Sequence, residues 1–340
     1  MPAMSTPSNA LLTLLGHIAH FGYVVLISPG STISLLSLAS AALISVVFLL
    51  MRKRMRPRLL LRALWPKRIF THASTRADIG LFLMNIFVTG SLIGWALVSA
   101  EGISHAVTGG LTAAFGHSPL PVLPDLARKA ILTVMLFLAY DFAYWLDHCI
   151  KHKVPFLWEF HRTHHTAEVL TPLTAFRMHP VDTAIFANIV STTTGLVGGA
   201  TLFLLGGGVH AATIGGTNLF LVLFLFGIIH LQHSHIDIRF TGWLGRVLFS
   251  PAHHHIHHST NPAYYDTNFG SCLAVWDWMF GMLIVPSASI RPGRLGTDAE
   301  HADEAPHSAI GSLIVPFGRA FRRLGIPFKR GEDRVLQPGE

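Results

Sequence analysis

The sequence predicts an all-α integral membrane protein, a bundle of about four to six membrane helices. Hydrophobic residues make up 51% of the 340 residues and charged residues only 13%. The mean hydropathy is +0.48, which is too apolar for an ordinary soluble domain and typical of a membrane protein. Long uncharged runs alternate with short basic segments, which indicates helices that cross the bilayer repeatedly.

Two apolar runs open the chain. Leu11–Ile27 is predicted to be a first membrane helix, Pro29-Gly30 a turn, and Thr32–Leu50 a second helix able to cross a hydrocarbon layer of about 30 Å. Basic residues follow at once and mark the cytoplasmic side; they are Arg52, Lys53, Arg54, Arg56, Arg58 and Arg62, with Lys67 and Arg68 close behind. Because this cluster adjoins a membrane helix, we interpret it as an anchor and expect no nucleic-acid partner.

The later spans follow from the same pattern. Ile79–Val98 leads outward, 101–125 is predicted to be a Gly- and Pro-containing loop, and a helix from Leu126 returns to His148. A further helix, from about Asp182 to Leu205, goes outward until Gly206–Gly208 breaks it, and the chain from Val209 returns to His233. Counting from the basic cluster, this topology puts 148–179 and 230–258 on the cytoplasmic side.

We predict three regions. Residues 1–125 hold the N-terminal membrane helices and loops, 126–285 a histidine-rich domain, and 286–340 a polar, basic, partly disordered tail. Within the tail, 299–307 is predicted to be disordered. Ile314–Lys329 mixes aromatic and aliphatic residues with arginines, which predicts either a basic helix on the inner leaflet or a solvated tail.

Three histidine-rich segments predict a metal centre. They are His148-Cys-Ile-Lys-His152, His161-Arg-Thr-His164-His165 and His254-His-Ile-His257-His258. Residues at i, i+3 and i+4 share one face of a helix, so each segment can direct its imidazoles to one place. Eight imidazoles are too many for one ion, so we expect two ions side by side near the cytoplasmic face of the membrane. The two cysteines, Cys149 and Cys272, are too few for a thiolate site and are interpreted as packing residues.

Imidazole ligands suit iron, zinc, copper and nickel. Two irons with open positions can reduce O2 and attack a C–H bond; two zincs would activate water, a hydrolase alternative for which more carboxylates would be expected. A histidine-rich metal transporter is a further alternative, but it would carry histidines inside its spans. Asp141 precedes His148 by two helical turns and is predicted to accept a hydrogen bond from a ligand ring, with a helix-capping or packing role as the alternative.

These residues resemble the fatty acid hydroxylase superfamily, which includes sterol desaturases, methylsterol oxidases, carotenoid hydroxylases and alkylglycerol monooxygenase. The resemblance covers roughly residues 138–285. It rests on the three boxes and on neighbouring motifs, which are Asp141-Phe-Ala-Tyr-Trp145, Leu157-Trp-Glu-Phe-His161, Thr174-Ala-Phe-Arg-Met-His179-Pro180, Gln232-His233-Ser234, Ser250-Pro251, Asp266-Thr-Asn-Phe-Gly270 and Trp276-Asp-Trp-Met-Phe-Gly281.

The resemblance implies a diiron oxygenase whose metal site is buried in a helical cap on the cytoplasmic face. Such an enzyme hydroxylates or desaturates a lipid, such as a sterol or a fatty acyl chain. The implied ligands are His148, His152, His161, His164, His165, His254, His257 and His258, with His233 completing the site and His179 as a further candidate. The chain has Asp182 where this family tends to have Glu, which puts a supporting contact in question. His230, His235, His253 and His255 are left open between ligand, supporting and packing roles.

The implied partners are a lipid substrate from the bilayer, O2 and an electron-transfer protein. The chain has no flavin, nicotinamide or haem-attachment motif, so electrons must come from outside, from a ferredoxin or cytochrome with its reductase. Lys151, Lys153 and Arg162 are predicted to be exposed near the boxes, where they either steer an acidic donor or simply follow the positive-inside bias.

Overall fold

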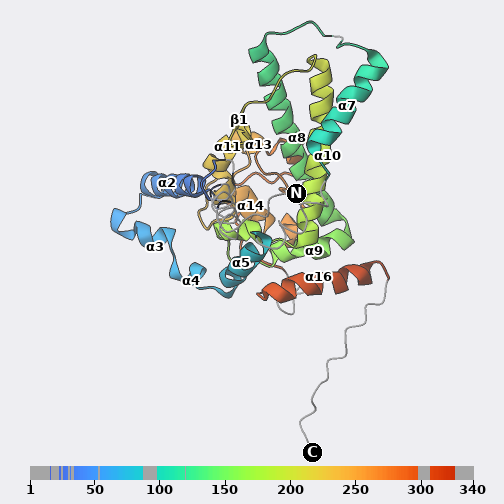
Figure 1. Cartoon of the computed structure of the whole chain (residues 1–340). Coiled ribbons are helices and arrows are strands. Elements are labelled where there is room, and N and C mark those ends of the chain that lie inside the picture. The colour runs from blue at the N-terminus through green and yellow to red at the C-terminus, as the bar shows by residue number, and fades with distance from the viewer. Residues whose placement is uncertain are drawn as a thin grey trace, which may run out of the picture.

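The fold is mostly helical (Figure 1), in agreement with the predicted all-α class. The structure, a computed structural model, describes residues 16, 23, 26–29, 31, 34–52, 54–86, 98–118, 120–297 and 307–325. Most of the predicted first membrane helix, Leu11–Ile27, and nearly all of the segment 299–307 lie outside these ranges. The only β-strands among the described residues form a two-stranded antiparallel hairpin, β1 (Thr213–Ile214) and β2 (Thr217–Asn218).

Two long apolar helices form the upright part of the molecule in Figure 1. They are α8 (Asp125–Lys153) and α10 (Pro180–Leu204), and each is long and apolar enough to cross a membrane. A 29-residue helix rises about 44 Å, more than the roughly 30 Å of a hydrocarbon core. Gly206, Gly207 and Gly208 end α10 with positive φ angles, as predicted.

The segment 101–125 is not the predicted loop. Most of it forms α7 (Ala100–Phe115), which packs along α10. Gly195 and Gly199 of α10 allow this close approach, because a Cβ at Gly199 would lie 2.6 Å from the Ser104 carbonyl oxygen and one at Gly195 would lie 2.7 Å from Ile103 Cβ. Glycines four residues apart are a common device for packing membrane helices. The glycines of 101–125 suggested a loop, but helix packing overrode that local preference.

The remaining apolar helices are shorter. α2 (Leu35–Met51) corresponds to the predicted second span, and it packs on η5, a π-helical turn at Leu225–Ile229. α11 (Leu219–Phe224), η5 and α12 (His230–Gln232) together cover 14 residues, which rise only about 21 Å. The predicted return from Val209 therefore begins with the hairpin and ends in a helical stretch shorter than a full crossing. Only the first part of the predicted span Ile79–Val98 is described, within α5 (Ala73–Met84) and just beyond it.

A cap of short helices lies around the lower ends of α8 and α10 in Figure 1. Its elements after α8 are α9 (Pro155–His165), η4 (Pro172–Phe176), α13 (Leu244–Val247), α14 (Pro251–His257), η6 (Pro262–Tyr264), α15 (Val275–Met279) and α16 (Ala309–Arg323). The basic N-terminal segment contributes η1 (Pro57–Leu59), α3 (Leu60–Leu64) and α4 (Lys67–Phe70). Pro at the first position opens α9, α10 and α14, where its missing N–H costs nothing.

Arg177 fastens the second histidine segment to α5. Its guanidinium is fully buried, pairs with Asp78 at 2.9 Å and donates to the Thr166 hydroxyl at 2.8 Å and to the Thr163 carbonyl at 3.1 Å. A buried arginine needs this many partners, because an unpaired buried charge is strongly destabilising. Arg177 thereby fixes the end of α9, which carries three of the histidines.

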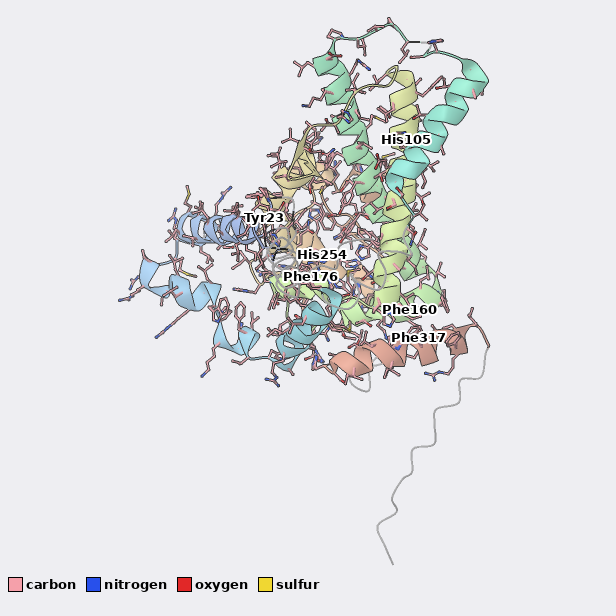
Figure 2. All side chains as sticks on the ribbon, in the orientation of Figure 1. Tyr23, His105, Phe160, Phe176, His254 and Phe317 are labelled. Carbon is pink, nitrogen blue, oxygen red and sulfur yellow. The ribbon has the colours of Figure 1, made fainter. Side chains whose placement is uncertain are left out.

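The described part of the predicted segment Ile314–Lys329 is a docked helix and not a solvated tail. α16 packs on α9 and α5, and its buried face consists of the small residues Ser312, Gly318 and Ala320 together with Pro316. Figure 2 shows Phe160 of α9 beside Phe317 of α16, with ring centroids 5.4 Å apart. The helix therefore forms one wall of the cap.

Candidate metal centre

The structure brings nine of the ten predicted ligand histidines together in two adjacent groups. The five-histidine group consists of His148, His152, His161, His165 and His257. The four-histidine group consists of His164, His233, His254 and His258. In each group one nitrogen of every ring lies within 4.8 Å of the others, and all of these residues are buried except His152, which is nearly so. Figure 2 places His254 deep within the cap.

The spacing of the histidines decides which group each joins. The i, i+4 pairs His148/His152 and His161/His165 belong to the five-histidine group, and the pair His254/His258 belongs to the four-histidine group. The histidine at i+3 in each HxxHH box, His164 or His257, turns to the other group. Each HxxHH box therefore contributes histidines to both groups, which keeps the two sites adjacent. The His165 and His258 rings, one from each group, stack with centroids 4.6 Å apart.

The ring nitrogens converge as ligands of a common ion would. Within the four-histidine group, successive Nε2 atoms of His164, His233, His254 and His258 lie 3.1, 2.8 and 3.0 Å apart. His165 Nε2 lies 3.1 Å from His152 Nε2 and 3.2 Å from His257 Nε2. Two imidazole nitrogens about 2.1 Å from one ion and at right angles would be about 3 Å apart. Both groups thus fit a metal ion.

The Nε2 atoms of His148 and His161 provide a second test of that fit. Both are buried and have no hydrogen-bond partner among the described residues. A buried polar atom without a partner is costly in a folded protein and calls for an explanation such as an ion. Both atoms belong to the five-histidine group.

Outer hydrogen bonds fix the tautomer of three rings. His148 Nδ1 donates to the Phe269 carbonyl at 2.9 Å, His257 Nδ1 to the Thr267 carbonyl at 2.9 Å, and His161 Nδ1 to Asp182 Oδ2 at 3.1 Å. A neutral ring that donates through Nδ1 presents a lone pair at Nε2, which is the arrangement typical of metal-bound histidines. Asp182 therefore makes the supporting contact that the sequence left in question.

The electrostatic environment favours the neutral form of six of the nine rings. Burial lowers the pKa of His164, His165, His254 and His258 well below its ordinary value, and neighbouring histidines lower it further. The same causes lower the pKa of His233 to about 3, and burial lowers that of His257 to about 3. Clustered imidazoles cannot all carry protons in a dry interior. Their lone pairs are therefore available to a cation at neutral pH.

The loop Asp266–Gly270 supplies two of the supporting carbonyls. Asp266 and Asn268 take up positive φ angles of 58° and 59°, which Asn and Asp tolerate better than most residues. The Asp277 carboxylate accepts from the Phe269 and Gly270 amides, both at 2.9 Å, and from Trp145 Nε1 at 3.0 Å. The motif is recognisable in the sequence, but the role of its carbonyls is not, because the residue types do not show where a backbone carbonyl points.

Asp141 does not make the predicted contact with a ligand ring. Its carboxylate accepts from the amides of Cys272 at 2.9 Å and Leu273 at 3.3 Å, and from Trp276 Nε1 at 2.9 Å. These bonds tie the 270s loop to α8. Asp141 thus supports the site by fixing the backbone at Cys272 and Leu273. Its position two helical turns before His148 suggested a contact with a ligand ring that the structure does not have.

His179 lies in neither group. Its Nδ1 accepts from the Val181 amide at 3.1 Å and caps α10, while its Nε2 donates to the Leu313 carbonyl at 3.0 Å. A ring that accepts through Nδ1 carries its proton on Nε2, so neither nitrogen is free for a metal. The prediction of His179 as a ligand is therefore not supported by the geometry; the residue joins α10 to α16.

The four histidines left open also lie outside the two groups. His253 accepts from the Ser250 amide at 3.0 Å through Nδ1 and donates to the Gly245 carbonyl through Nε2. His230 Nε2 contacts Ser37 Oγ at 2.9 Å, and His235 Nε2 contacts the Ala63 carbonyl at 2.7 Å. His255 is buried but belongs to neither group. These residues pack and cap the elements around the metal centre.

Two of the three basic residues predicted to be exposed are buried. The Lys151 side chain is 1% exposed and pairs with Asp147 at 2.6 Å and with Asp182. Arg162 is buried against Glu159, at 3.2 Å. Lys153 is exposed, but it pairs with Asp266 at 2.7 Å. Lys151 and Arg162 therefore cannot form a surface that attracts an acidic donor, because local ion pairs draw them inward.

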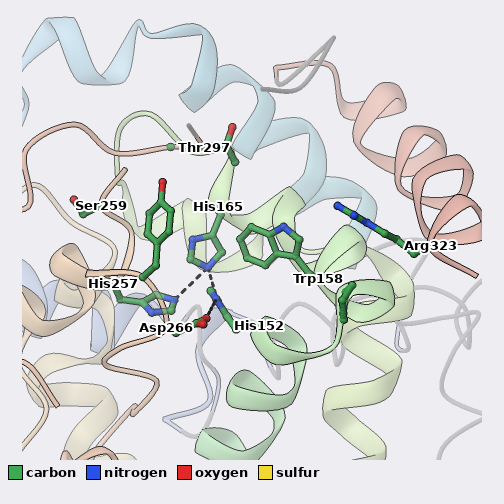
Figure 3. A pocket seen from close by; sticks show the side chains of 11 residues that line it. His152, Trp158, His165, His257, Ser259, Asp266, Thr297 and Arg323 are labelled. Atoms are coloured by element: carbon green, nitrogen blue, oxygen red, sulfur yellow. Dashed lines mark hydrogen bonds and ion pairs between the residues drawn. The ribbon is translucent and has the colours of Figure 1, made fainter. Parts of the chain in front are cut away.

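One cavity reaches the five-histidine group (Figure 3). Its volume is about 330 Å³, and it is lined by His152, His165 and His257 together with Pro155, Trp158, Ser259, Tyr265, Asp266, Gly296, Thr297 and Arg323. No member of the four-histidine group lines this cavity. A small molecule in this cavity therefore lies beside the five-histidine group.

Comparisons with known proteins find matches over the region that holds both histidine groups. The sequence model of the fatty acid hydroxylase family matches residues 133–282. The ornithine lipid hydroxylase OlsE of Rhizobium tropici is 28% identical over 215 residues, 63% of this chain and 58% of that protein. The alkylglycerol monooxygenases of Xenopus tropicalis and Homo sapiens are 31% and 30% identical over 44% and 43% of this chain, but over only 30% and 29% of their own lengths. No solved structure matches the chain significantly.

Proposed function

Residues 133–282 belong to the fatty acid hydroxylase family, and from this premise we propose that the protein is a membrane-bound, O2-dependent oxidoreductase that hydroxylates a lipid at a diiron centre. Its similarity to lipid hydroxylases and monooxygenases supports the reaction class. The matched region spans less than two thirds of each of these relatives, so the substrate and the partners of this chain are part of the proposal.

The observation that carries the proposal is the sorting of nine buried imidazoles into two adjacent groups. The five-histidine group and the four-histidine group would each hold one iron. When bound, such a pair supplies the reduction of O2 and the cleavage of an unactivated C–H bond. Neither group contains a carboxylate, whereas a zinc site that activates water commonly uses Asp or Glu.

The protein's own residues position and protect this centre. Phe269, Thr267 and Asp182 orient three ligand rings through their Nδ1 protons. Burial of the rings excludes bulk water, which protects a reactive site from side reactions. The cavity beside His152, His165 and His257 gives O2 and the reacting carbon access to the five-histidine group.

Hydroxylation consumes the lipid R–H, one O2, two electrons and two protons, and it yields R–OH and one water. Desaturation would instead remove two hydrogens from the lipid and yield two waters from the same O2, electrons and protons. Both reactions need an external reductant, and we propose a one-electron carrier protein, such as a ferredoxin or a cytochrome with its reductase. Because Lys151 and Arg162 are buried, the carrier would dock elsewhere on the cap.

We also propose a multi-pass protein whose metal centre faces the cytoplasm. The two helices long enough to cross a membrane support membrane association. His148 and His152 lie in the last two turns of α8, so the centre would sit at the end of that helix and not along its middle. The basic residues of 52–68 favour the cytoplasm for the adjoining cap.

The test combines metal content with lipid analysis. Cells that express the full chain, or its His257→Ala variant, are grown under ¹⁸O2, and their lipids are analysed by mass spectrometry. We expect the unchanged chain to add one ¹⁸O atom to a lipid class and the His257→Ala variant to add none, because it loses a ligand of the five-histidine group. His253→Asn is the matched control, since Asn Oδ1 can replace the capping acceptor Nδ1 in the same segment, and it should retain activity.

Each outcome of that experiment has a definite meaning. Loss of two hydrogens without added ¹⁸O would replace hydroxylation by desaturation. A lipid change that persists without O2, in a protein that contains only zinc in the cell, would favour a hydrolase and refute the proposal. Full activity of His257→Ala would remove His257 from the centre.

A further inference from the structure

The cavity beside the five-histidine group has a polar, charged rim. Of its lining residues, only His152 belongs to a helix long enough to cross a membrane, and His152 lies in the last turn of that helix. The rest come from α9, α14, α16 and the loops around 259–266 and 296–297. The cavity thus lies at the polar end of α8, away from its apolar length.

Arg323 of α16 stands at one side of this cavity. Its Nε donates to Glu159 Oε1 at 3.1 Å, and its side chain is 49% exposed. In the view of Figure 3, Trp158 lies between Arg323 and His165, and the Trp158 and His165 rings are 5.2 Å apart. Arg323, Trp158 and His165 therefore line the cavity together, so the same cavity contacts the guanidinium and a proposed iron ligand. The bond to Glu159 holds Arg323 at the rim.

Arg323 is the arginine that faces the cavity. Lys153 and Asp266 pair at 2.7 Å on one side of the cavity. On the other side Glu159 contacts two arginines, Arg162 at 3.2 Å and Arg323 at 3.1 Å. Glu159 and Arg162 are buried, whereas the Arg323 side chain is half-exposed and lines the cavity.

We propose that Arg323 forms a binding subsite for the anionic group of an amphiphile, a phosphate or a carboxylate, and that this subsite selects the lipid substrate. The inference rests on the proposed lipid oxygenase function. A guanidinium matches both anions with paired hydrogen bonds, which a lysine cannot reproduce. The bond to Glu159 uses Nε, and the half-exposed Arg323 side chain lines the cavity.

The size of the cavity adds a positional expectation. A sphere of 330 Å³ is about 9 Å across, at the lower end of the range for small-molecule sites. An extended alkyl chain advances about 1.3 Å per carbon–carbon bond, so an anion held by Arg323 places the carbon beside the five-histidine group within about six bonds. The subsite therefore directs oxidation to the first few carbons beyond the anionic group, and not to the middle of a long acyl chain.

The test is a binding measurement that needs no turnover. The full chain in dodecyl maltoside micelles is titrated by calorimetry with butyl phosphate, which is too short to enter the micelle. Inorganic phosphate and butanol are titrated in parallel. We expect Arg323→Gln to weaken butyl phosphate binding about tenfold or more, since a hydrogen bond to a charged group contributes that much. The affinity of Arg323→Lys for butyl phosphate should lie between that of Arg323→Gln and that of the unchanged protein. Arg322→Gln is the matched control, because Arg322 is exposed in the same turn but does not line the cavity.

Equal affinity of Arg323→Gln and the unchanged protein would overturn the proposal, as would an equal loss in Arg322→Gln. Inorganic phosphate binding as tightly as butyl phosphate would mean a site for a free anion and not for an amphiphile. Butanol binding as tightly as butyl phosphate would remove the anion from recognition. If Arg323-dependent binding holds but no lipid gains ¹⁸O, the subsite stands and the proposed oxygenase function fails. If a lipid is oxidised far from any anionic group, the proposed oxygenase function stands and the subsite proposed at Arg323 fails.

Discussion

Asp182→Asn should weaken metal binding at the five-histidine group and leave the four-histidine group nearly unchanged. Asp182 accepts the Nδ1 proton of His161 at 3.1 Å and pairs with the buried Lys151. The substitution keeps a neutral hydrogen-bond acceptor of the same shape. It removes the negative charge that orients the His161 ring and strengthens its Nε2 as an electron-pair donor to a metal. Loss of such a supporting contact typically lowers metal affinity 10- to 100-fold, about 1.4–2.7 kcal/mol.

Asp147→Asn provides the matched control. Asp147 is the other partner of Lys151, at 2.6 Å, and it has no contact with a ligand ring in the structure. Both variants should lose about 1–3 kcal/mol of folding stability, because each weakens the pairing of a buried lysine. Only Asp182→Asn should change metal affinity.

The assay is a titration of the purified full chain with a competing chelator, followed by metal analysis of the protein fraction. Asp182→Asn should release one of its two ions at a chelator concentration 10- to 100-fold lower than the unchanged protein does, and the second ion at the usual concentration. Equal release from Asp147→Asn, or simultaneous release of both ions, would refute the role assigned to Asp182.

Three further predictions follow from the fold. His179→Ala should retain two ions per chain in metal analysis, yet lower the unfolding temperature, since loss of a cap costs about 1 kcal/mol; loss of an ion would make His179 a ligand after all. Burial lowers the pKa of His179, so its contribution to stability is present above pH 6.5 and lost as the pH falls below that value. Gly199→Ala should destabilise the α7–α10 contact by about 1–3 kcal/mol, whereas Gly110→Ala, where a Cβ meets no atom within 4 Å, should not; equal melting temperatures would contradict the packing. Reporters fused after Lys67 and after Ser259 should lie on the same side of the membrane, and opposite sides would break the proposed topology.

The sequence was a good guide to the metal centre because histidine spacing is a local property. An i, i+4 pair on a helix meets the same ion wherever the helix lies, so His148/His152 and His254/His258 could be recognised without any tertiary information. The division of each HxxHH box between two groups required the crossing of α9 and α14 in space. His179 resembled a ligand in its motif, but its position at the start of α10 gave its Nδ1 to a helix cap.

The sequence was a poorer guide wherever partners come from distant parts of the chain. Nothing local showed that the Phe269 and Thr267 carbonyls would meet His148 and His257. Lys151 looked exposed because lysine usually is, and only the approach of α10 provided the carboxylate of Asp182 that buries it. The glycines of 101–125 resembled a loop until their helix was seen packed on α10.

The most direct test of the central claim is an anomalous-scattering map of the purified full chain at the iron edge. Two adjacent peaks are expected, one bounded by Nε2 atoms of the five-histidine group and one by those of the four-histidine group, with every protein ligand a nitrogen. A single peak, or a peak at His179 or at the cysteines, would contradict the account.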